Sequence, residues 1–419
     1  MSGLKRVVVT GMGIVSNLGN DLQTFWNNLA EGRSGIRRIT RFDTSRHRCQ
    51  IAGEVDFDAE KEIGDLPNIR TDRMARASQY IVSATKQAIS QSGFPYRTLA
   101  DQIRAKVTVE IGANLIAMDR IAREVIKVAT KGARHALPTM VPIVMNNAPA
   151  YWVQRVFGFH GGGGASGNAC ATGGKAIIHA AEAIKTGRAL VGIAGATEDA
   201  IESTTIDSFG NSTALCTRYN NNPQRGSRPF DVDRCGFVPS EGAAVLFLED
   251  YELAKWRGAH ILAEIAGYGI TSDADHITSP EESGKWQAWA MEDAMVMAHI
   301  LPEEIDLISA HGTSTLLNDK TESIAIWRAY GEPAGSIPVI ATKSQIGHGM
   351  SAAMVQESVA LIQMMNEGVI IPTINLDHPD PECQLRHARE VTRKDIKVAT
   401  KNGFGFGGGN VCIIYRNGK

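Results

Sequence analysis

The sequence lacks the features by which several classes of protein are usually identified. No apolar run approaches the roughly 18 residues that a membrane-spanning helix needs, so we expect no membrane span. Neither sign of charge is in excess, because 43 Lys and Arg stand against 45 Asp and Glu, and this balance argues against a nucleic-acid partner. The six cysteines form no C-x-x-C pair and no regular framework, so we expect no metal site and a reduced, cytoplasmic protein.

Glycine is abundant, with 42 residues that cluster where apolar segments end, as tight turns between strands and helices require. The apolar segments are short and do not alternate with polar residues, which is typical of strands covered on both faces. Helical patterns separate them, so the expected fold class is α/β. The expected strands cover residues 6–10, 106–111, 189–194, 243–248, 261–268, 305–310, 339–341, 396–400 and 411–415. The expected helices cover residues 171–186, 251–257, 286–299 and 351–366.

The chain is long enough for two halves, and a weak internal similarity supports a duplicated architecture. VVVTGMGIVS at residues 7–16 resembles LAEIAGYGIT at residues 262–271 in its strand-then-glycine pattern. We place the boundary near residues 254–258, which gives an N-terminal half of residues 1–255 and a C-terminal half of residues 256–419.

Two glycine-rich segments come close to nucleotide-binding motifs but lack required residues. Gly11 and Gly13 follow the first strand, yet the last glycine of a dinucleotide fingerprint is missing, which favours a turn with close backbone packing. Gly174 and Lys175 resemble the end of a phosphate loop, but alanines stand at positions 169 and 176, where that motif needs glycine and Ser or Thr. A nucleotide site is therefore disfavoured.

Cys170 is the main candidate for a nucleophile. It ends the glycine-rich stretch GGGGASGNAC, and a predicted helix begins directly after it. A thiol at a helix N-terminus lies at the positive end of the dipole, near free N–H groups, so we expect a lowered pKa and a larger thiolate fraction. A lone cysteine is more often an inert core residue, so the assignment depends on the residues that accompany it.

Two histidines follow predicted strands of the C-terminal half. His311 stands in AHGTST directly after residues 305–310, and His348 ends KSQIGH, which follows residues 339–341. Catalytic groups gather at the carboxyl ends of strands in open α/β sheets. Either histidine alone would more often be a structural residue, but two at equivalent positions together with Cys170 favour a catalytic site. A metal site would need ligands from distant segments, without the close spacing that metal motifs show.

With these motifs in place, the chain resembles the β-ketoacyl-acyl-carrier-protein synthases, nearest their type II elongating branch, with type II polyketide ketosynthases as close relatives. The resemblance runs from residue 7 to GFGFGGGN at 403–410, and it includes ACAT around Cys170, HGTST, KSQIGH and PTINLD at 372–377. It implies a thiolase-type fold with duplicated halves in five layers, α/β/α/β/α. It also implies a homodimer or a heterodimer with a related subunit, and an acyl carrier protein as partner.

The resemblance implies a role for each matching residue. Cys170 corresponds to the nucleophile that accepts the acyl group, and His311 and His348 to the pair that promotes decarboxylation of malonyl thioester and stabilises the enolate. Lys343 corresponds to the lysine that supports the histidines. Phe404 corresponds to the gating aromatic residue, whose N–H would form an oxyanion hole with that of Cys170. The implied decarboxylative condensation needs no metal or redox cofactor.

Further residues match supporting positions of the family. Glu322 corresponds to a structural acid near Lys343, and Glu357 is assigned to the same network. Thr313 and Thr315 correspond to hydroxyls that hold the pantetheine arm, and Thr278 is grouped with them.

The sequence also departs from the family pattern. Cys235 stands where relatives usually have Asp, and Gly403 and Gly409 replace common Ser and Thr, which is expected to loosen the gating loop. Leu115 and Ile116 stand where many elongating relatives have a glycine-rich turn, so we expect them to shape the acyl pocket. These departures keep a specialised polyketide or polyene pathway open, with a Cys-less chain-length partner.

Two rival functions and one docking hypothesis remain. A thiolase-like enzyme would need a second cysteine as base, and Cys412 lies inside a strand pattern instead of a catalytic loop. A non-enzymatic chain-length subunit would lack the nucleophile. Because the whole chain is nearly neutral, an acidic carrier protein is expected to dock on a local basic cluster. The candidate clusters are Arg70, Arg73 and Arg76, and Lys127, Lys131 and Arg134.

Overall fold

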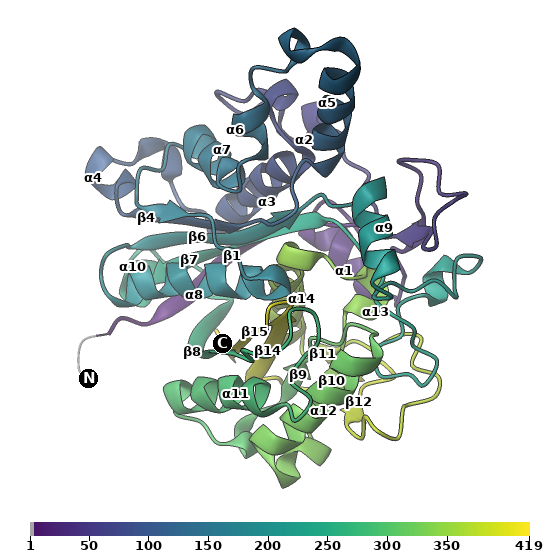
Figure 1. Ribbon diagram of the computed structural model, residues 1–419. Coiled ribbons are helices and arrows are strands. Elements are labelled where there is room, and N and C mark those ends of the chain that lie inside the picture. Colours follow the sequence, from purple (N-terminus) through teal and green to yellow (C-terminus); the bar gives the residue numbers. More distant parts are fainter. Residues whose placement is uncertain (1–3) are drawn as a thin grey trace.

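The computed structural model describes residues 4–419, which form two stacked β-sheets with helices between and outside them (Figure 1). The first sheet has the strand order β1-β7-β6-β4-β5 and the second has the order β8-β15-β14-β9-β10-β12. The first-sheet strands are Val7–Val15 (β1), Gly242–Asp250 (β7), Val191–Glu198 (β6), Val107–Gly112 (β4) and Gly163–Gly164 (β5). The second-sheet strands are Ala263–Ser272 (β8), Gly409–Asn417 (β15), Val398–Gly405 (β14), Leu307–Ser309 (β9), Pro338–Ile340 (β10) and Arg386–His387 (β12). The two sheets meet where β1 and β8 pair over only two residues.

The two sheets repeat one pattern of strand pairing. In each, the first two neighbouring pairs are antiparallel and the next two are parallel: β1·β7 and β7·β6 then β6·β4 and β4·β5, against β8·β15 and β15·β14 then β14·β9 and β9·β10. The chain order of the five strands is also the same in both. The expectation of two duplicated halves is therefore confirmed by the topology.

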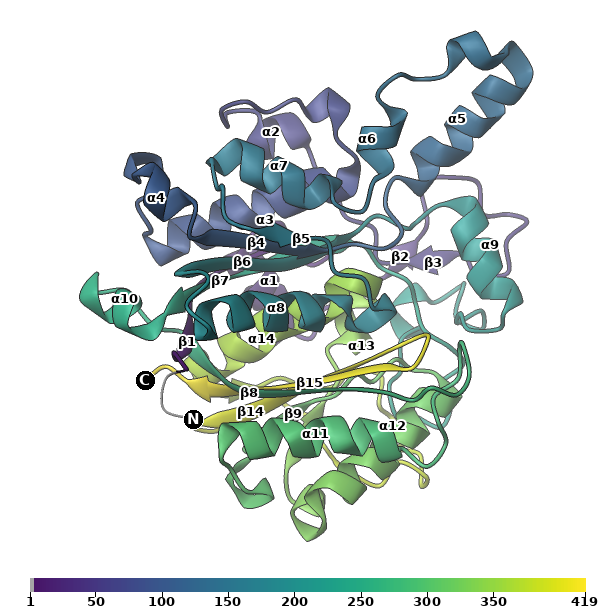
Figure 2. The ribbon, with the colours of Figure 1, turned by 60° about the vertical axis from the view of Figure 1, so that its left-hand side comes forward.

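The helices complete five layers, as Figure 2 shows from the side. The central layer holds α8 (Thr172–Lys185) and α14 (Ala353–Glu367), which contact each other and pack against both sheets. Outside the first sheet lie α3 (Arg76–Ser92) and α7 (Ala148–Phe157), and outside the second lie α11 (Lys285–Ala298) and α12 (Leu316–Tyr330). The α/β/α/β/α arrangement expected for a thiolase-type fold is confirmed.

Glycine pairs let the outer helices approach the sheets closely. A Cβ at Gly11 or Gly13 of β1 would come within 2.1 and 1.8 Å of carbonyl oxygens of α3. A Cβ at Gly267 or Gly269 of β8 would likewise come within 2.3 and 2.0 Å of carbonyl oxygens of α11. The close packing expected at Gly11 and Gly13 is therefore correct, but both lie inside an extended strand and the expected turn is wrong.

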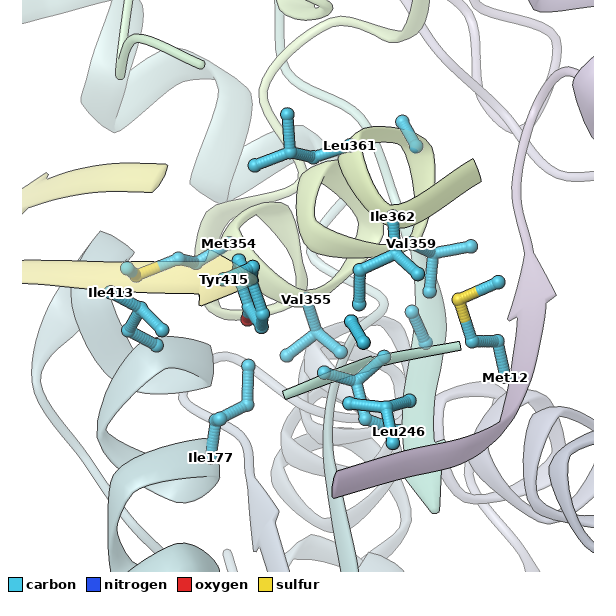
Figure 3. Packing of buried hydrophobic residues seen from close by; sticks show 14 of the residues in the cluster. Met12, Ile177, Leu246, Met354, Val355, Val359, Leu361, Ile362, Ile413 and Tyr415 are labelled. Atoms are coloured by element: carbon cyan, nitrogen blue, oxygen red, sulfur yellow. The ribbon is translucent and has the colours of Figure 1, made fainter. Parts of the chain in front are cut away.

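The central layer is apolar because its helices have no solvent-facing side. Figure 3 shows Met354, Val355 and Val359 of α14 packed among side chains of both sheets and of α8. The central helix α8 consists mainly of small residues, and a Cβ at Gly174 would come within 2.2 Å of the Met354 sulfur. The two halves are thus joined by a dry, closely packed helix pair.

The remaining elements are connections around this frame. One long excursion between β4 and β5 carries α5 (Met118–Lys131) and α6 (Met140–Val144) away from the sheets (Figure 1). The other short elements are α1 (Leu22–Ala30), α2 (Ala59–Ile63), α4 (Asp101–Arg104), α9 (Ser203–Asn211), α10 (Tyr251–Trp256), α13 (Lys343–Ile346), β2 (Arg37–Arg38), β3 (Ile51–Ala52), β11 (Val369–Ile370) and β13 (Thr392–Arg393). Within residues 4–419, no helix is both long and apolar enough to span a bilayer.

All nine expected strands and all four expected helices occur, with shifted ends. β1 and β8 run several residues further than expected because glycines inside them continue the strand, and β9 is shorter than the apolar run around it. The expected helix over 351–366 begins at Ala353, after a 3₁₀ turn at Met350–Ala352.

Candidate active site

A cavity of about 710 Å³ brings together residues from both halves of the chain. Cys170 lines it from the connection between β5 and α8, His311 from the segment after β9, and His348 from the segment after α13. The three candidates that the sequence spaced far apart therefore face one space. Among residues 4–419, no group of three His, Cys, Asp or Glu side chains is placed to hold a metal ion.

Cys170 occupies a 3₁₀ turn, Ala169–Ala171, that leads directly into α8. The preceding Ala169 has φ of 45°, an unusual value for a non-glycine residue that turns the chain towards the cavity. Burial raises the pKa of the Cys170 thiol to about 11, while the charge of Lys343 and the backbone N–H of Phe406 act in the opposite direction. The lowered pKa expected at Cys170 is therefore not supported, because burial raises that pKa more than Lys343 and the Phe406 N–H lower it.

Each catalytic histidine candidate has its Nδ1 atom held by a donor. The backbone N–H of Met350 donates to His348 Nδ1 at 3.3 Å, and Lys343 Nζ lies 3.4 Å from His311 Nδ1. Because a backbone amide and an ammonium group can only donate, both Nδ1 atoms accept and both Nε2 atoms carry the proton. Burial, followed by the charge of Lys343, lowers the pKa of both imidazoles well below the ordinary value. The rings, 5.4 Å apart between centroids, are thus two neutral N–H donors in one cavity.

Behind the histidines lies a buried chain of charges. Lys343 Nζ donates to Glu357 Oε1 at 2.6 Å and to the His311 carbonyl at 2.7 Å, and Lys401 Nζ lies 2.8 Å from Glu357 Oε2. Burial lowers the pKa of Lys401 to about 8, against the attraction of Glu357. Lys401 of β14 was not predicted as a site residue. It stands within the buried residues of an interior strand, where no sequence motif marks it.

Glu322 belongs to the same buried network. Its two carboxylate oxygens accept from the backbone N–H groups of His311 and Gly312 at 2.7 and 2.8 Å. Glu357 is the carboxylate that contacts Lys343, whereas Glu322 lies near that lysine, as expected, through the backbone of His311 that both residues bind. Glu322 fixes the turn that carries His311, as a carboxylate accepting two backbone donors does well.

Phe404, the expected gating residue, and its neighbour Phe406 both line the cavity but differ in exposure. Phe404 is buried, lies edge-on to His311 with centroids 5.7 Å apart, and pairs in the sheet with Asn410. Phe406, two residues on, is 38% exposed where it lines the cavity, and its backbone N–H is the one directed at the Cys170 thiol. These observations favour Phe406 over Phe404 as the gate and as the oxyanion donor, and both roles stay predictions. Both phenylalanines lie between two glycines in the sequence, so that pattern could not distinguish them.

The two glycines that depart from the family do not create empty space. A Cβ at Gly403 would come within 2.5 Å of the Met354 sulfur, and one at Gly409 within 2.4 Å of the Asn168 side chain. Larger neighbours fill the space that the usual Ser and Thr would take. The two glycines were expected to loosen the gating loop, but the chain is closely packed at both positions, so this expectation is wrong.

The expected substrate-binding hydroxyls line the same cavity. Thr313 Oγ1 and Thr315 Oγ1 are 2.8 Å apart, and Thr315 also caps α12 by accepting from the N–H of Asn318. Thr278 lines the cavity from an exposed loop, beside His276. All three threonines thus line the one cavity, two of them in direct contact.

Leu115 and Ile116, although adjacent, point to different surroundings. Leu115 lines the cavity, and its N–H donates to Glu198, a buried carboxyl that burial gives a pKa of about 7. Ile116 is buried in a small cluster with Ala77 and Ala113 and does not line the cavity. The placement expected for Leu115 is supported, and the one expected for Ile116 is wrong because the turn directs successive side chains to opposite sides.

Comparison with known proteins agrees with this geometry. The family model for the N-terminal domain of β-ketoacyl synthases matches residues 4–254, and that for the C-terminal domain matches residues 262–377. The chain is 40% identical to a 3-oxoacyl-[acyl-carrier-protein] synthase 2 of Synechocystis sp., covering 98% of both proteins. It is 38% identical to the protein of the same name from Vibrio harveyi, again over 98% of each.

Solved structures show the same likeness over the whole chain. The ishigamide ketosynthase/chain length factor matches with a TM-score of 0.91 and 32% identity, over 99% of this chain and 100% of that one. A type II polyketide ketosynthase, solved with its acyl-carrier protein and a bound hexaketide, matches with a TM-score of 0.90 and 31% identity, over 99% of each. From motifs, topology, cavity and comparisons together, the chain belongs to the β-ketoacyl synthase family.

Proposed function

We propose that this protein is a β-ketoacyl-acyl-carrier-protein synthase, which condenses an acyl thioester with malonyl-acyl-carrier protein and releases carbon dioxide. The observation that carries the proposal is the convergence of one thiol and two neutral N–H-bearing imidazoles, from opposite halves, on one cavity. Curated relatives named 3-oxoacyl-[acyl-carrier-protein] synthase 2 support the same reaction over nearly the full length.

In the first half-reaction, Cys170 takes the acyl group. Its sulfur attacks the thioester carbonyl and the carrier thiol leaves, so the acyl group is held as a new thioester. The N–H groups of Cys170 and Phe406 are placed to receive the oxyanion that forms during attack. A single donor of this kind contributes roughly 3–4 kcal/mol to the transition state.

In the second half-reaction, the histidine pair acts on malonyl thioester. Loss of carbon dioxide places negative charge on the thioester oxygen, where the Nε2–H groups of His311 and His348 can donate. Both rings are neutral and carry their proton on Nε2, so each can donate one hydrogen bond to this charge. The resulting carbanion attacks the acyl carbonyl on Cys170, the carbon–sulfur bond to Cys170 breaks, and the extended chain stays on the carrier while the Cys170 sulfur is set free. Lys343 holds His311 in the donating tautomer, and Thr313 and Thr315 are placed to bind the pantetheine arm.

The partners follow from the reaction and from the relatives. An acyl carrier protein delivers both substrates, as in the ketosynthase solved with its carrier. We expect a homodimer or a heterodimer with a related subunit, the latter as in the ketosynthase/chain length factor. A role as the ketosynthase subunit of a type II polyketide-like heterodimer is the second candidate, and Leu115 at the cavity wall favours it over an ordinary elongating enzyme. All six cysteines within residues 4–419 are free, which fits a cytoplasmic location.

The deciding experiment measures carbon dioxide release and condensation with malonyl-acyl-carrier protein. We expect both activities in the native protein, and loss of condensation after Cys170→Ala. Cys383→Ala, which removes a thiol from the core of the C-terminal half, is the matched control and should leave condensation intact. Acyl transfer without malonyl decarboxylation would instead indicate a thiolase-like enzyme, and no activity of either kind would indicate a chain-length subunit.

A further inference from the structure

Two cysteines outside the proposed catalytic set lie side by side at the cavity wall. The sulfur atoms of Cys216 and Cys235 are 3.1 Å apart. Cys235 lines the cavity and is partly exposed, whereas Cys216 is fully buried behind it. Neither thiol has a task in the proposed condensation.

We propose that Cys216 and Cys235 are a redox-active dithiol, a modification site at which a hydroperoxide forms a reversible disulfide that slows the reaction in the adjoining cavity. A disulfide requires two sulfurs about 2.05 Å apart, so the pair needs to close by only about 1 Å. The two residues lie at the two ends of one connection between α9 and β7, on either side of the 3₁₀ turn Pro223–Arg225. The bond would therefore join two segments that are now held only by hydrogen bonds and packing.

The chemistry balances with the peroxide as the only oxidant. The Cys235 sulfur attacks one peroxide oxygen, the O–O bond breaks, and a sulfenic acid and one molecule of water or alcohol form. The Cys216 sulfur then attacks the Cys235 sulfur and displaces hydroxide, which leaves as water with the Cys216 proton. Two thiols lose two electrons in total, and the peroxide bond takes them up.

The surroundings of the pair select Cys235 as the thiol that reacts first. The Cys216 thiol and the backbone N–H groups of Arg218 and Thr217 lower the pKa of Cys235, against the effect of burial. The partner and burial both raise the pKa of Cys216. The thiolate character thus lies on the sulfur that faces the cavity, where a small oxidant can reach it, and the protonated sulfur is placed as the resolving thiol.

The disulfide would act on the site through Phe237. The Cys216 N–H donates to the Phe237 carbonyl at 2.9 Å, and the Phe237 N–H donates to Ala214 at 2.9 Å. The Phe237 ring lies edge-on to His348, with centroids 5.3 Å apart. The neighbouring Gly236 N–H donates to the carbonyl of Ser314, between the two cavity threonines. Drawing the two segments together therefore shifts residues that contact His348 and the threonine pair.

The chemical test uses mass spectrometry on Cys170→Ala protein, in which the competing thiol is absent. After hydrogen peroxide, free thiols are alkylated and the protein is digested with trypsin without reductant; cleavage after Arg218 and Arg234 places the two cysteines on different peptides. We expect the two peptides to be joined through Cys216 and Cys235, with a mass about 2 Da below their sum, and separated again by a phosphine. Independent alkylation of both cysteines, or sulfinic acid at Cys235 with Cys216 free, would overturn the proposal.

The functional test rests on the proposed condensation, whereas the mass-spectrometric test detects the disulfide without it. A failure of the disulfide proposal can therefore be distinguished from a failure of the proposed function. Cys170 is first protected as its acyl thioester, peroxide is added and removed, and single-turnover condensation is then measured. We expect the rate to fall at least tenfold in the native protein and to recover with a phosphine. In Cys216→Ser, and separately in Cys235→Ser, the ratio of treated to untreated rates should stay near one. An equal fractional loss in these variants would refute the effect on the cavity.

Discussion

A thiol whose pKa is about 11 keeps its proton at neutral pH, so we expect Cys170 to be in the thiol form there. Alkylation by iodoacetamide requires the thiolate, so the rate at Cys170 should rise about tenfold per pH unit between pH 7 and 9. The measurement is the rate of adduct formation on the peptide containing Cys170, with Cys170→Ala as the blank. An alkylation rate that does not rise above pH 7 would show that the pKa of Cys170 is below 7, so that the helix terminus lowers it more than burial raises it.

His311 and His348 are expected to serve decarboxylation, whereas Cys170 serves acyl loading, and the pKa of both imidazoles is lowered where that of the thiol is raised. Replacing His311 or His348 by Ala should leave acyl loading of Cys170 measurable but reduce carbon dioxide release by about two orders of magnitude, the scale of one lost electrostatic donor. Because the pKa of both rings is depressed, the neutral donors persist below pH 6.5, and decarboxylation by the native protein should not decline at that pH. His260→Ala, at an exposed histidine, is the matched control. Normal carbon dioxide release in both site variants would exclude the assigned role.

At the scale of elements, α14 contributes one carboxylate that neutralises lysines from α13 and β14. Glu357→Gln removes that charge with little change of shape and leaves Lys343 and Lys401 buried without an anion. The free energy of unfolding should fall by about 3–5 kcal/mol, as for other broken buried pairs. Glu382→Gln breaks the exposed pair with Lys320 and should cost less than about 1 kcal/mol. Equal urea midpoints for the two variants would contradict this account.

In the turn after β4, Leu115 and Ile116 allow a test that separates shaping of the cavity from packing of the core. Leu115→Ala enlarges the cavity and should change the rank order of kcat/KM across a series of acyl lengths, by about 10- to 200-fold for the favoured chains. Ile116→Ala removes side-chain volume from a buried cluster, so stability should fall by about 2–5 kcal/mol with the rank order kept. A uniform loss at every length in the Leu115 variant, with a lower Tm, would assign that side chain to packing alone.

The elements differ in how far their residues could be predicted. Cys170, His311 and His348 lie in short contiguous motifs next to strand or helix ends, so local pattern was enough to find them. Lys401 and Glu357 are paired across distant parts of the chain, and nothing near either residue in sequence encodes that contact. Phe404 and Phe406 are two residues apart in one glycine-rich run, and both line the cavity. Only the observed end of β14 at Gly405 separates the buried one from the exposed one.

At the scale of the whole molecule, the docking hypothesis can now be narrowed to one cluster. Arg76 is turned inwards, with its guanidinium 3.1 Å from Asp119 and 3.6 Å from Glu241, so the cluster around Arg70 has lost a member. Lys131 and Arg134, at the end of α5 and just beyond it, are exposed. Arg70 is also paired, 3.0 Å from Asp72, and in the second cluster Lys127 is paired, 2.7 Å from Glu124. The second cluster thus keeps two exposed cations and the first keeps one, so the second is the better candidate for an acidic carrier protein.

Reversing Lys131 and Arg134 to Glu should raise the KM for the carrier substrate at low salt, mainly through slower association. Lys255→Glu together with Lys397→Glu makes the same change of net charge at other exposed positions and should leave KM unaltered. If the two double variants have the same KM, the docking surface lies elsewhere.

The overall architecture was predictable because the order of strands and helices limits an α/β chain to few topologies. The division at residues 255 and 256 stays a proposal; α10 lies between the last strand of the first half and the first strand of the second. The excursion with α5 and α6 was not predicted. The sequence of α5 is amphipathic, but periodicity alone does not show that a helix lies outside the layers.

The two matched halves no longer hold matched chemistry. The 3₁₀ turns before α8 and α14 correspond, with φ of 45° at Ala169 and 49° at Met350, yet the first presents Cys170 and the second Ser351. Two residues beyond β4 stands Asn114, and two residues beyond β9 stands His311. Under the proposed function, one copy holds the acyl group and the other supplies the hydrogen-bond donors, so their alignment depends on the helix pair between them. A small slip of α8 along α14 would uncouple the two half-reactions in a protein that is still fully folded.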